Sequence, residues 1–309
     1  MPLTIWALKI RGLSICFTIG NWIWSCISSL PRLINRSPVR DVETASSPCS
    51  KSVDEYSNDI ETNERYSNSR NAQGEFISGG ITGIVELLDD GTVLKAPYPG
   101  REIENHIIDI AKEADIYRRI GPHNRLVRMI SHSREGLVLE YMKNGDLKTY
   151  LQAHDSISTS LRLKWASQIA EAVGILHSNG VIHCDIKPRN FLLDPAFDIK
   201  IIDFSGSSLD GSKPASGEGT RFFLPRYWQE HPTVATDLFA LGSTLYEIST
   251  GTSPYEEIPS DEVERLFLQK EFPDISGLLC GQIIQQCWLS QVDSAAEVQT
   301  AIQSIISLA

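Results

Sequence analysis

The sequence predicts an α+β chain folded into two lobes, because a strand-rich part precedes a helix-rich part. Residues 76–95 alternate apolar and polar side chains around a turn, whereas residues 160–178 repeat apolar side chains at helical spacing. The segments beyond Asp237 are mostly helical as well. With 309 residues, of which 41 % are hydrophobic, the chain is long and apolar enough to bury a core.

The first 40 residues carry five basic side chains and no acidic one, and residues 12–30 contain no charge. A membrane-spanning helix needs about 20 predominantly apolar residues, so this stretch is long enough, although serine, threonine and asparagine interrupt it. Four interpretations stay open: a membrane anchor, an interfacial helix, a transit peptide, or an incorrectly assigned start of the coding sequence. If the stretch spans a membrane, the basic residues favour a cytosolic location for the following chain.

Residues 41–75 contain 11 charged and only 8 apolar residues, with many serines, threonines and asparagines between them. Such a segment cannot bury enough apolar surface to offset its ordering entropy, which predicts a disordered linker. The globular part follows, over residues 76–305. Its first hairpin turns at residues 89–91, residues 101–120 predict a helix, and residues 136–142 predict a strand.

Charge and cysteine usage narrow the function classes. The net charge of −11 argues against a generic nucleic-acid binder, which needs a basic surface. The six cysteines show neither a disulfide framework nor metal-ligand spacing, a pattern typical of a reducing compartment. We therefore expect a cytoplasmic protein, with membrane association depending on residues 12–30, and no nucleic-acid partner.

Two segments carry the chemistry. The first is His183-Cys184-Asp185-Ile186-Lys187-Pro188-Arg189-Asn190, followed thirteen residues later by Asp203. Two acids and an amide on loops beside a short hairpin can share divalent cations and polarise a hydroxyl. The second is Ser78-Gly79-Gly80-Ile81-Thr82-Gly83, whose glycines let backbone N–H groups approach phosphates closely. It precedes Lys95 and a helix that contains Glu113.

In their order and intervals, these segments resemble the motifs of the eukaryotic protein kinase superfamily, serine/threonine type, over about residues 76–305. The resemblance also includes a hinge at residues 140–142 and the helix segment 237–242. It implies a bilobal kinase fold, with residues 76–142 as the N-lobe and residues 143–305 as the C-lobe. It further implies a monomer that uses ATP and Mg²⁺ to phosphorylate serine or threonine of a protein substrate.

The resemblance implies a role for each matching residue. Asp185 would be the catalytic base, Lys187 would neutralise the transferred phosphoryl group, and Glu113 would hold Lys95 by an ion pair. Asp203 and Asn190 would hold Mg²⁺. The residues that would bind ATP are Gly79, Gly80, Gly83, Val85, Lys95, Glu140 and Met142, with Leu139 as gatekeeper before the hinge.

Other matching residues would organise the site. Asp237 would brace the catalytic loop through its backbone N–H groups, and Thr220 would connect that loop to the substrate groove. His183 would pack with Phe204 and Tyr117 in a stack that joins the lobes. Trp288 is expected in the core rather than at a ligand.

Cys184 departs from the family pattern, because an arginine that receives an activation-loop phosphate usually precedes the catalytic aspartate. We therefore expect a non-RD kinase whose activity does not need loop phosphorylation. Replacing four serines of the loop by alanine is expected to leave rates nearly intact. These are Ser207, Ser208, Ser212 and Ser216.

Three further departures concern single positions. Ser205 stands where glycine usually ends the metal motif, and Ser78 stands at the first loop glycine. Arg226 stands where a glutamate is usual, and Asp293 lies near the place of that glutamate's arginine partner. This double exchange predicts an ion pair between Arg226 and Asp293.

Two alternatives to an active protein kinase stay open: a pseudokinase scaffold, and a kinase-like phosphotransferase that acts on a small molecule or within a complex. The intact set of Lys95, Glu113, Asp185, Asn190 and Asp203 argues against the scaffold. A bare kinase domain behind a hydrophobic basic leader also resembles small kinase-like proteins of fungi.

Overall fold

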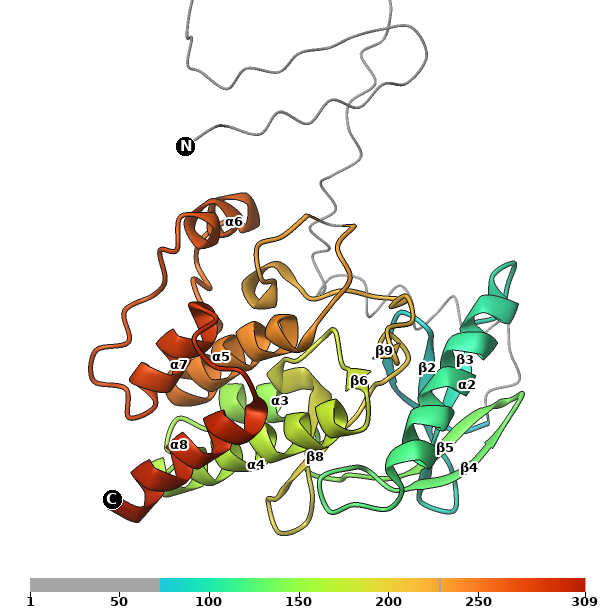
Figure 1. Cartoon of the computed structure of the whole chain (residues 1–309). Coiled ribbons are helices and arrows are strands. Elements are labelled where there is room, and N and C mark those ends of the chain that lie inside the picture. Colours follow the sequence, from blue (N-terminus) through green and yellow to red (C-terminus); the bar gives the residue numbers. More distant parts are fainter. Residues whose placement is uncertain (1–72, 228, 309) are drawn as a thin grey trace, which may run out of the picture. The chain divides into compact units, whose positions relative to one another are not determined.

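The computed structural model describes residues 73–227 and 229–308, all within one compact unit (Figure 1). The predicted leader, residues 1–40, lies outside the described residues, as does the predicted linker apart from residues 73–75. The expected anchor, the disorder and the cytoplasmic location therefore stay predictions. Within the described part of the chain, no helix has the length and apolar character needed to cross a bilayer.

A five-stranded antiparallel sheet opens the described chain, with strand order β1-β2-β3-β5-β4. The strands are β1 (Glu75–Gly79), β2 (Gly83–Leu87), β3 (Thr92–Pro97), β4 (Met129–Ser133) and β5 (Gly136–Glu140). The hairpin between β2 and β3 turns where the sequence predicted, and Gly91 there adopts a φ of +79°. A side chain is also excluded at position 83, because a Cβ there would overlap the Ala96 carbonyl oxygen of β3.

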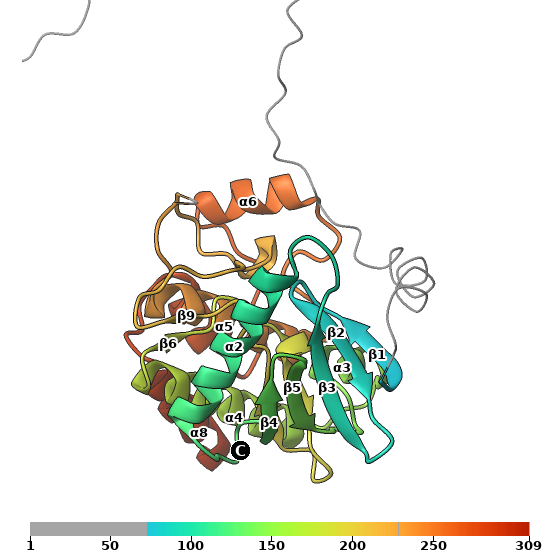
Figure 2. The same cartoon turned by 90° about the vertical axis from the view of Figure 1, so that its right-hand side faces the viewer.

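Helix α2 (Ile103–Ile120) packs against β3, β4 and β5, as Figure 2 shows. Its buried face repeats at intervals of three and four residues through Ile110, Glu113 and Tyr117. The helix ends at Gly121, whose φ of +74° suits glycine. One carboxylate is therefore carried into the interior on an otherwise apolar face.

The rest of the chain is mainly helical and confirms the predicted α+β order. Its helices are α3 (Leu147–Ala153), α4 (Thr159–Ser178), α5 (Val234–Thr250), α6 (Ser260–Leu268), α7 (Gly281–Trp288) and α8 (Ala295–Leu308). The short elements are β6 (Val181–Ile182), η1 (Pro188–Asn190), β7 (Phe191–Leu193), β8 (Ile199–Ile201), β9 (Ser208–Leu209) and η2 (Thr220–Phe222). Strand β7 pairs with β8 and β6 with β9, so the loops that carry the polar motifs begin and end at short antiparallel strand pairs.

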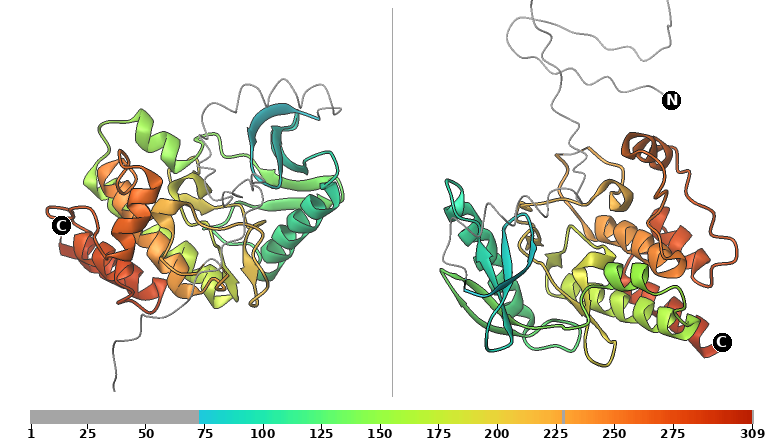
Figure 3. Two further views of the ribbon diagram at one scale, coloured as in Figure 1. Left: turned by 90° about the horizontal axis from the view of Figure 1, so that it is seen from above. Right: turned by 180° about the vertical axis from the view of Figure 1, so that it is seen from behind.

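Helices α4 and α5 form the centre of the helical part, with α8 packed along α4 and α7 along α5 (Figure 3). The side chain of Ser158 accepts a hydrogen bond from the Leu161 amide and so caps α4. Trp165 is fully buried on this helix, and its indole N–H donates to the Phe197 carbonyl at 2.9 Å. Trp288 lies in the core as predicted, with its indole N–H donating to Ser243 at 3.0 Å.

Candidate active site

Lys95 forms ion pairs with two carboxylates, and the three side chains come from three separate parts of the chain. The Lys95 ammonium, on β3, lies 2.7 Å from Oε2 of Glu113 on α2 and 2.5 Å from Oδ1 of Asp203 in the loop after β8. Lys95 and Glu113 are both buried, whereas the Asp203 side chain is 38 % exposed. The ion pair expected from the sequence between Lys95 and Glu113 is therefore present, and Asp203 completes a cluster with one exposed edge.

The electrostatics of this cluster keep Lys95 and Asp203 charged. Burial by itself would lower the pKa of Lys95, but the carboxylates of Asp203 and Glu113 outweigh it and raise that pKa. Burial would likewise raise the pKa of Asp203, yet the Lys95 ammonium outweighs it and lowers the pKa to about 2. At neutral pH, the cluster thus presents an ammonium beside an ionised carboxylate.

The predicted catalytic loop, residues 183–190, places Asp185, Lys187 and Asn190 side by side. The amide of Asn190 donates to the Asp185 carbonyl at 2.8 Å and to its Oδ2 at 3.0 Å, while the Lys187 ammonium lies 3.0 Å from the same Oδ2. Oδ1 of Asp185 is buried and has no hydrogen-bond partner. One oxygen of this carboxylate is thus held in place, and the other is left to accept a proton or a hydrogen bond.

Asp237, in the first turn of α5, braces this loop as the sequence predicted. Its carboxylate accepts the backbone N–H of His183 at 2.8 Å and of Cys184 at 3.0 Å, and Nε2 of His177 lies 2.9 Å away. Cys184 has a φ of +67°, an unusual conformation for a residue other than glycine. The buried carboxylate therefore supports the backbone at a residue in a strained conformation.

Replacing Asp237 by alanine is expected to lower the free energy of unfolding by about 3 kcal/mol, because two buried backbone N–H groups lose their acceptor. Urea denaturation measures this change. The control is the exposed Asp293, whose replacement by alanine should leave the urea midpoint unchanged. Equal midpoints for both variants would show that Asp237 does not brace the loop.

An aromatic stack connects α2 with the two polar loops. The Phe204 ring lies edge-on to Tyr117 at 5.0 Å and to His183 at 5.6 Å between ring centroids. This confirms the stack predicted from the sequence. Since His183 also lies 3.0 Å from the Ile202 carbonyl through Nε2, it has a structural place rather than that of a base.

The glycine-rich segment connects β1 to β2 and closes a tight turn in which the Gly80 N–H donates to the Gly83 carbonyl at 2.9 Å. A Cβ at Gly79 would overlap the Tyr98 hydroxyl, so a larger residue there would displace the end of that side chain. Val85 follows on β2, opposite Lys95 on β3. The predicted loop, Val85 and the ammonium thus share one region of the sheet.

The hinge predicted at residues 140–142 follows β5 directly. Leu139 and Met142 are buried, and the Glu140 side chain accepts the Arg128 backbone N–H at 2.7 Å. Met142 therefore points into the protein, whereas the Tyr141 side chain between it and Glu140 is exposed. Thr220 begins η2, and its predicted connection to the catalytic loop stays a prediction.

The donors that remain around Asp203 and Asn190 suit Mg²⁺, which prefers carboxylate and amide oxygens. Oδ1 of Asp203 is taken by Lys95 and Ser205, which leaves Oδ2, and the Asn190 nitrogen is engaged by Asp185, which leaves its oxygen. Among residues 73–227 and 229–308, no three His, Cys, Asp or Glu side chains gather as a metal site.

Cys184 cannot take over the phosphate-binding role of the arginine it replaces. Its side chain is buried, and its thiol donates to the Ile182 carbonyl at 3.3 Å. Burial, together with the Asp237 carboxylate, raises the pKa of the thiol far above its usual range. The thiol therefore stays neutral.

The predicted ion pair between Arg226 and Asp293 is wrong. Arg226 pairs instead with Glu218 at 2.8 Å, and its guanidinium lies 4.3 Å above the Phe223 ring. Asp293 is exposed, and its backbone N–H donates to Glu297. The local partner prevails because Glu218 lies eight residues before Arg226 on the same segment and its side chain is fully buried, where a carboxylate needs a counter-ion.

Sequence reasoning also missed a hydrogen-bond network at Ser205. The sequence shows the serine in place of glycine, but it does not predict the hydroxyl's bonds to Thr82, Asp203 and Lys95. A hydroxyl two residues after Asp203, the predicted metal ligand, is the signal that could have indicated them.

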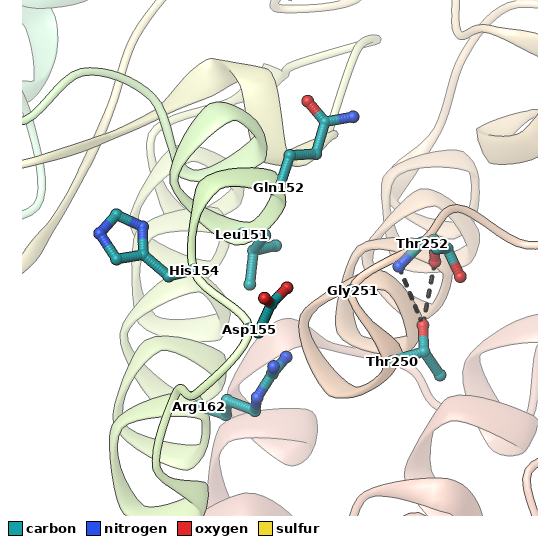
Figure 4. A pocket seen from close by; sticks show the side chains of 8 residues that line it. All are labelled: Leu151, Gln152, His154, Asp155, Arg162, Thr250, Gly251 and Thr252. Atoms are coloured by element: carbon teal, nitrogen blue, oxygen red, sulfur yellow. Dashed lines mark hydrogen bonds between the residues drawn. The ribbon is translucent and has the colours of Figure 1, made fainter.

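A surface hollow between α3 and the end of α5 lies apart from these residues (Figure 4). It is lined by Leu151, Gln152, His154, Asp155, Arg162, Thr250, Gly251 and Thr252. None of them belongs to the predicted site.

Comparison with known proteins gives a consistent result. The sequence pattern described as "Protein kinase domain" matches residues 90–306. The chain is 29 % identical over 188 residues to human receptor-interacting serine/threonine-protein kinase 1, covering 53 % of this chain and 28 % of the relative. It is 40 % identical over 126 residues to serine/threonine-protein kinase RUNKEL of Arabidopsis thaliana, covering 38 % of this chain and 9 % of the relative. It is 32 % identical over 171 residues to serine/threonine-protein kinase pim-2 of Danio rerio, covering 48 % and 55 %. The chain thus spans at most about half the length of these relatives.

Proposed function

Because this chain belongs to the protein kinase family, we propose that it is an active kinase that transfers the γ-phosphoryl group of ATP to a serine or threonine hydroxyl of a protein. The observation that carries the proposal is the complete polar set in one site: Lys95 with Glu113 and Asp203, and Asp185 with Asn190 and Lys187. A scaffold without catalysis has no need of all these residues in bonding distance.

The ammonium of Lys95 faces the phosphates of ATP, oriented by Glu113. The glycine-rich loop covers them with backbone N–H groups, and the hinge at residues 140–142 receives the adenine. Asp203 and Asn190 hold Mg²⁺, which supplies positive charge against the phosphate oxygens when bound. Together, these residues hold the triphosphate in one orientation.

Asp185 acts on the second substrate. Its Oδ2 is held by Asn190 and Lys187, so its Oδ1 accepts the proton of the substrate hydroxyl. The hydroxyl oxygen forms a bond to the γ-phosphorus while the bond from that phosphorus to the β-phosphate oxygen breaks, and ADP leaves. Lys187 neutralises the moving charge. Its place two residues after Asp185 favours a serine or threonine substrate.

Incubating the full chain with γ-labelled ATP, Mg²⁺ and a generic protein mixture tests the proposal. Label is expected on serine and threonine, and it should disappear in the Asp203→Ala variant. The exposed Asp293→Ala variant serves as the matched control and should retain the label. Thermal stabilisation by ATP and Mg²⁺ without transfer of label would support a pseudokinase instead. Label on tyrosine alone would contradict the substrate class.

A further inference from the structure

Two buried hydroxyls connect the glycine-rich loop to the metal-binding segment. Thr82 and Ser205 are 5 % and 4 % exposed, and the Thr82 hydroxyl donates to the Ser205 hydroxyl at 3.0 Å. The two residues are 123 positions apart in the sequence. This bond therefore joins parts of the chain that come together only in the folded protein.

The Ser205 hydroxyl extends this connection to the Asp203 carboxylate. It donates to Oδ1 of Asp203 at 3.0 Å and accepts from the Lys95 ammonium at 3.3 Å. One hydroxyl thus accepts two hydrogen bonds and donates one, which uses its full bonding capacity. Because Oδ1 of Asp203 receives both Lys95 and Ser205, the carboxylate cannot rotate without losing two bonds.

The geometry of the loop selects Thr82 for this contact. Gly80 and Gly83 close the turn, and Ile81 at its tip is 74 % exposed while the adjacent Thr82 is buried. The two neighbouring side chains therefore point in opposite directions, and only Thr82 faces the interior. Glycine at position 205 would leave the Thr82 hydroxyl without this partner.

We propose that Ser205 and Thr82 are positioning residues: Ser205 fixes the Asp203 carboxylate so that its second oxygen faces the cation, and Thr82 ties the glycine-rich loop to the same point. This inference rests on the proposed function, since it assigns the loop to the phosphates and Asp203 to Mg²⁺. The hydroxyl pair thus makes the position of the glycine-rich loop and the binding of the cation depend on each other.

Hydrogen exchange of the full chain without nucleotide tests the contact itself. Thr82→Val keeps the shape of the side chain and removes its hydroxyl, and Ser205→Ala removes the partner. Both should speed the exchange of the loop amides at residues 79–83 by about tenfold. Thr82→Ser keeps the hydroxyl, so the loop amides of this variant should exchange as slowly as those of the unaltered chain. Ser207→Ala is the matched control, because it removes a buried hydroxyl that donates to the His183 carbonyl instead.

Nucleotide titrations test the consequence. In Ser205→Ala, the Mg²⁺ concentration that gives half-maximal thermal stabilisation with ATP should rise about tenfold, and the KM for ATP should rise with it. Ser207→Ala should change neither value. Exchange rates and Mg²⁺ requirements equal to those of Ser207→Ala would overturn the inference. If the unaltered chain transfers no label, the proposed function fails, but the exchange and stabilisation measurements still decide this inference.

Discussion

Replacing Lys95 by methionine is expected to lower the rate of phosphoryl transfer by about a thousandfold or more, because the one ammonium that joins Glu113 and Asp203 is lost. Methionine has a similar length and no charge, so it keeps the packing and removes the electrostatic contribution. The Michaelis constants and the turnover number, measured with labelled ATP, separate weaker binding from slower transfer.

The same variant should lose about 3 kcal/mol in free energy of unfolding, because Glu113 is left buried without its counter-ion. Adding Glu113→Leu should restore much of this stability and none of the activity. Urea denaturation gives the stability of both variants. If the Lys95→Met/Glu113→Leu variant recovered activity, the ion pair would contribute to stability only and not to catalysis.

Local patterns predicted the fold because they follow from the spacing of apolar residues. The helix expected over 160–178 extends over Thr159–Ser178, and the hairpin turns at residues 89–91 as expected. The order of the motifs along the chain and the intervals between them were sufficient to show the resemblance to protein kinases. The stack of Phe204 and the brace at Asp237 followed from that resemblance alone, since no local pattern places either contact.

Partners of single polar side chains were less predictable. Nothing in the sequence around Glu218 signals that its carboxylate is buried, so the family pattern alone favours Asp293 as the partner of Arg226. The bond between Thr82 and Ser205 joins two hydroxyls that could each have bonded to water or to backbone. Contacts of this kind depend on which groups the tertiary fold leaves without solvent, which spacing along the chain does not encode.

The second large effect is expected in the segment between Asp203 and Arg226, which contains Glu218. Glu218 carries a fully buried side chain, and its carboxylate meets Arg226 through both oxygens, at 3.2 Å and 2.8 Å. A negative charge built into the segment thus pairs with an arginine, without any added phosphate. Together with the neutral thiol at Cys184, this arrangement favours a segment that is ordered without modification.

Glu218→Ala is therefore expected to lower the free energy of unfolding by about 3 kcal/mol, since the Arg226 charge loses its partner in a mostly buried place. Activity should fall at least about tenfold if the segment also shapes the site. Exchanging the charges, with Glu218→Arg and Arg226→Glu together, should recover part of the stability. The exposed ion pair of Glu262 and Arg265 is the matched control, and Glu262→Ala should leave both quantities unchanged.

Replacing the accessible serines between Asp203 and Arg226 should, by contrast, have little effect on the transfer rate. Of the four serines expected to be dispensable, Ser207 and Ser208 are buried and donate to backbone carbonyls, whereas Ser212 is exposed and Ser216 is half-buried. The Ser212→Ala/Ser216→Ala variant should therefore keep its transfer rate within about twofold. A loss on the order of a hundredfold, about 2.7 kcal/mol of barrier, would mean that a phosphate orders the segment after all. Glu218 and Arg226 would then form a structural pair without influence on activation.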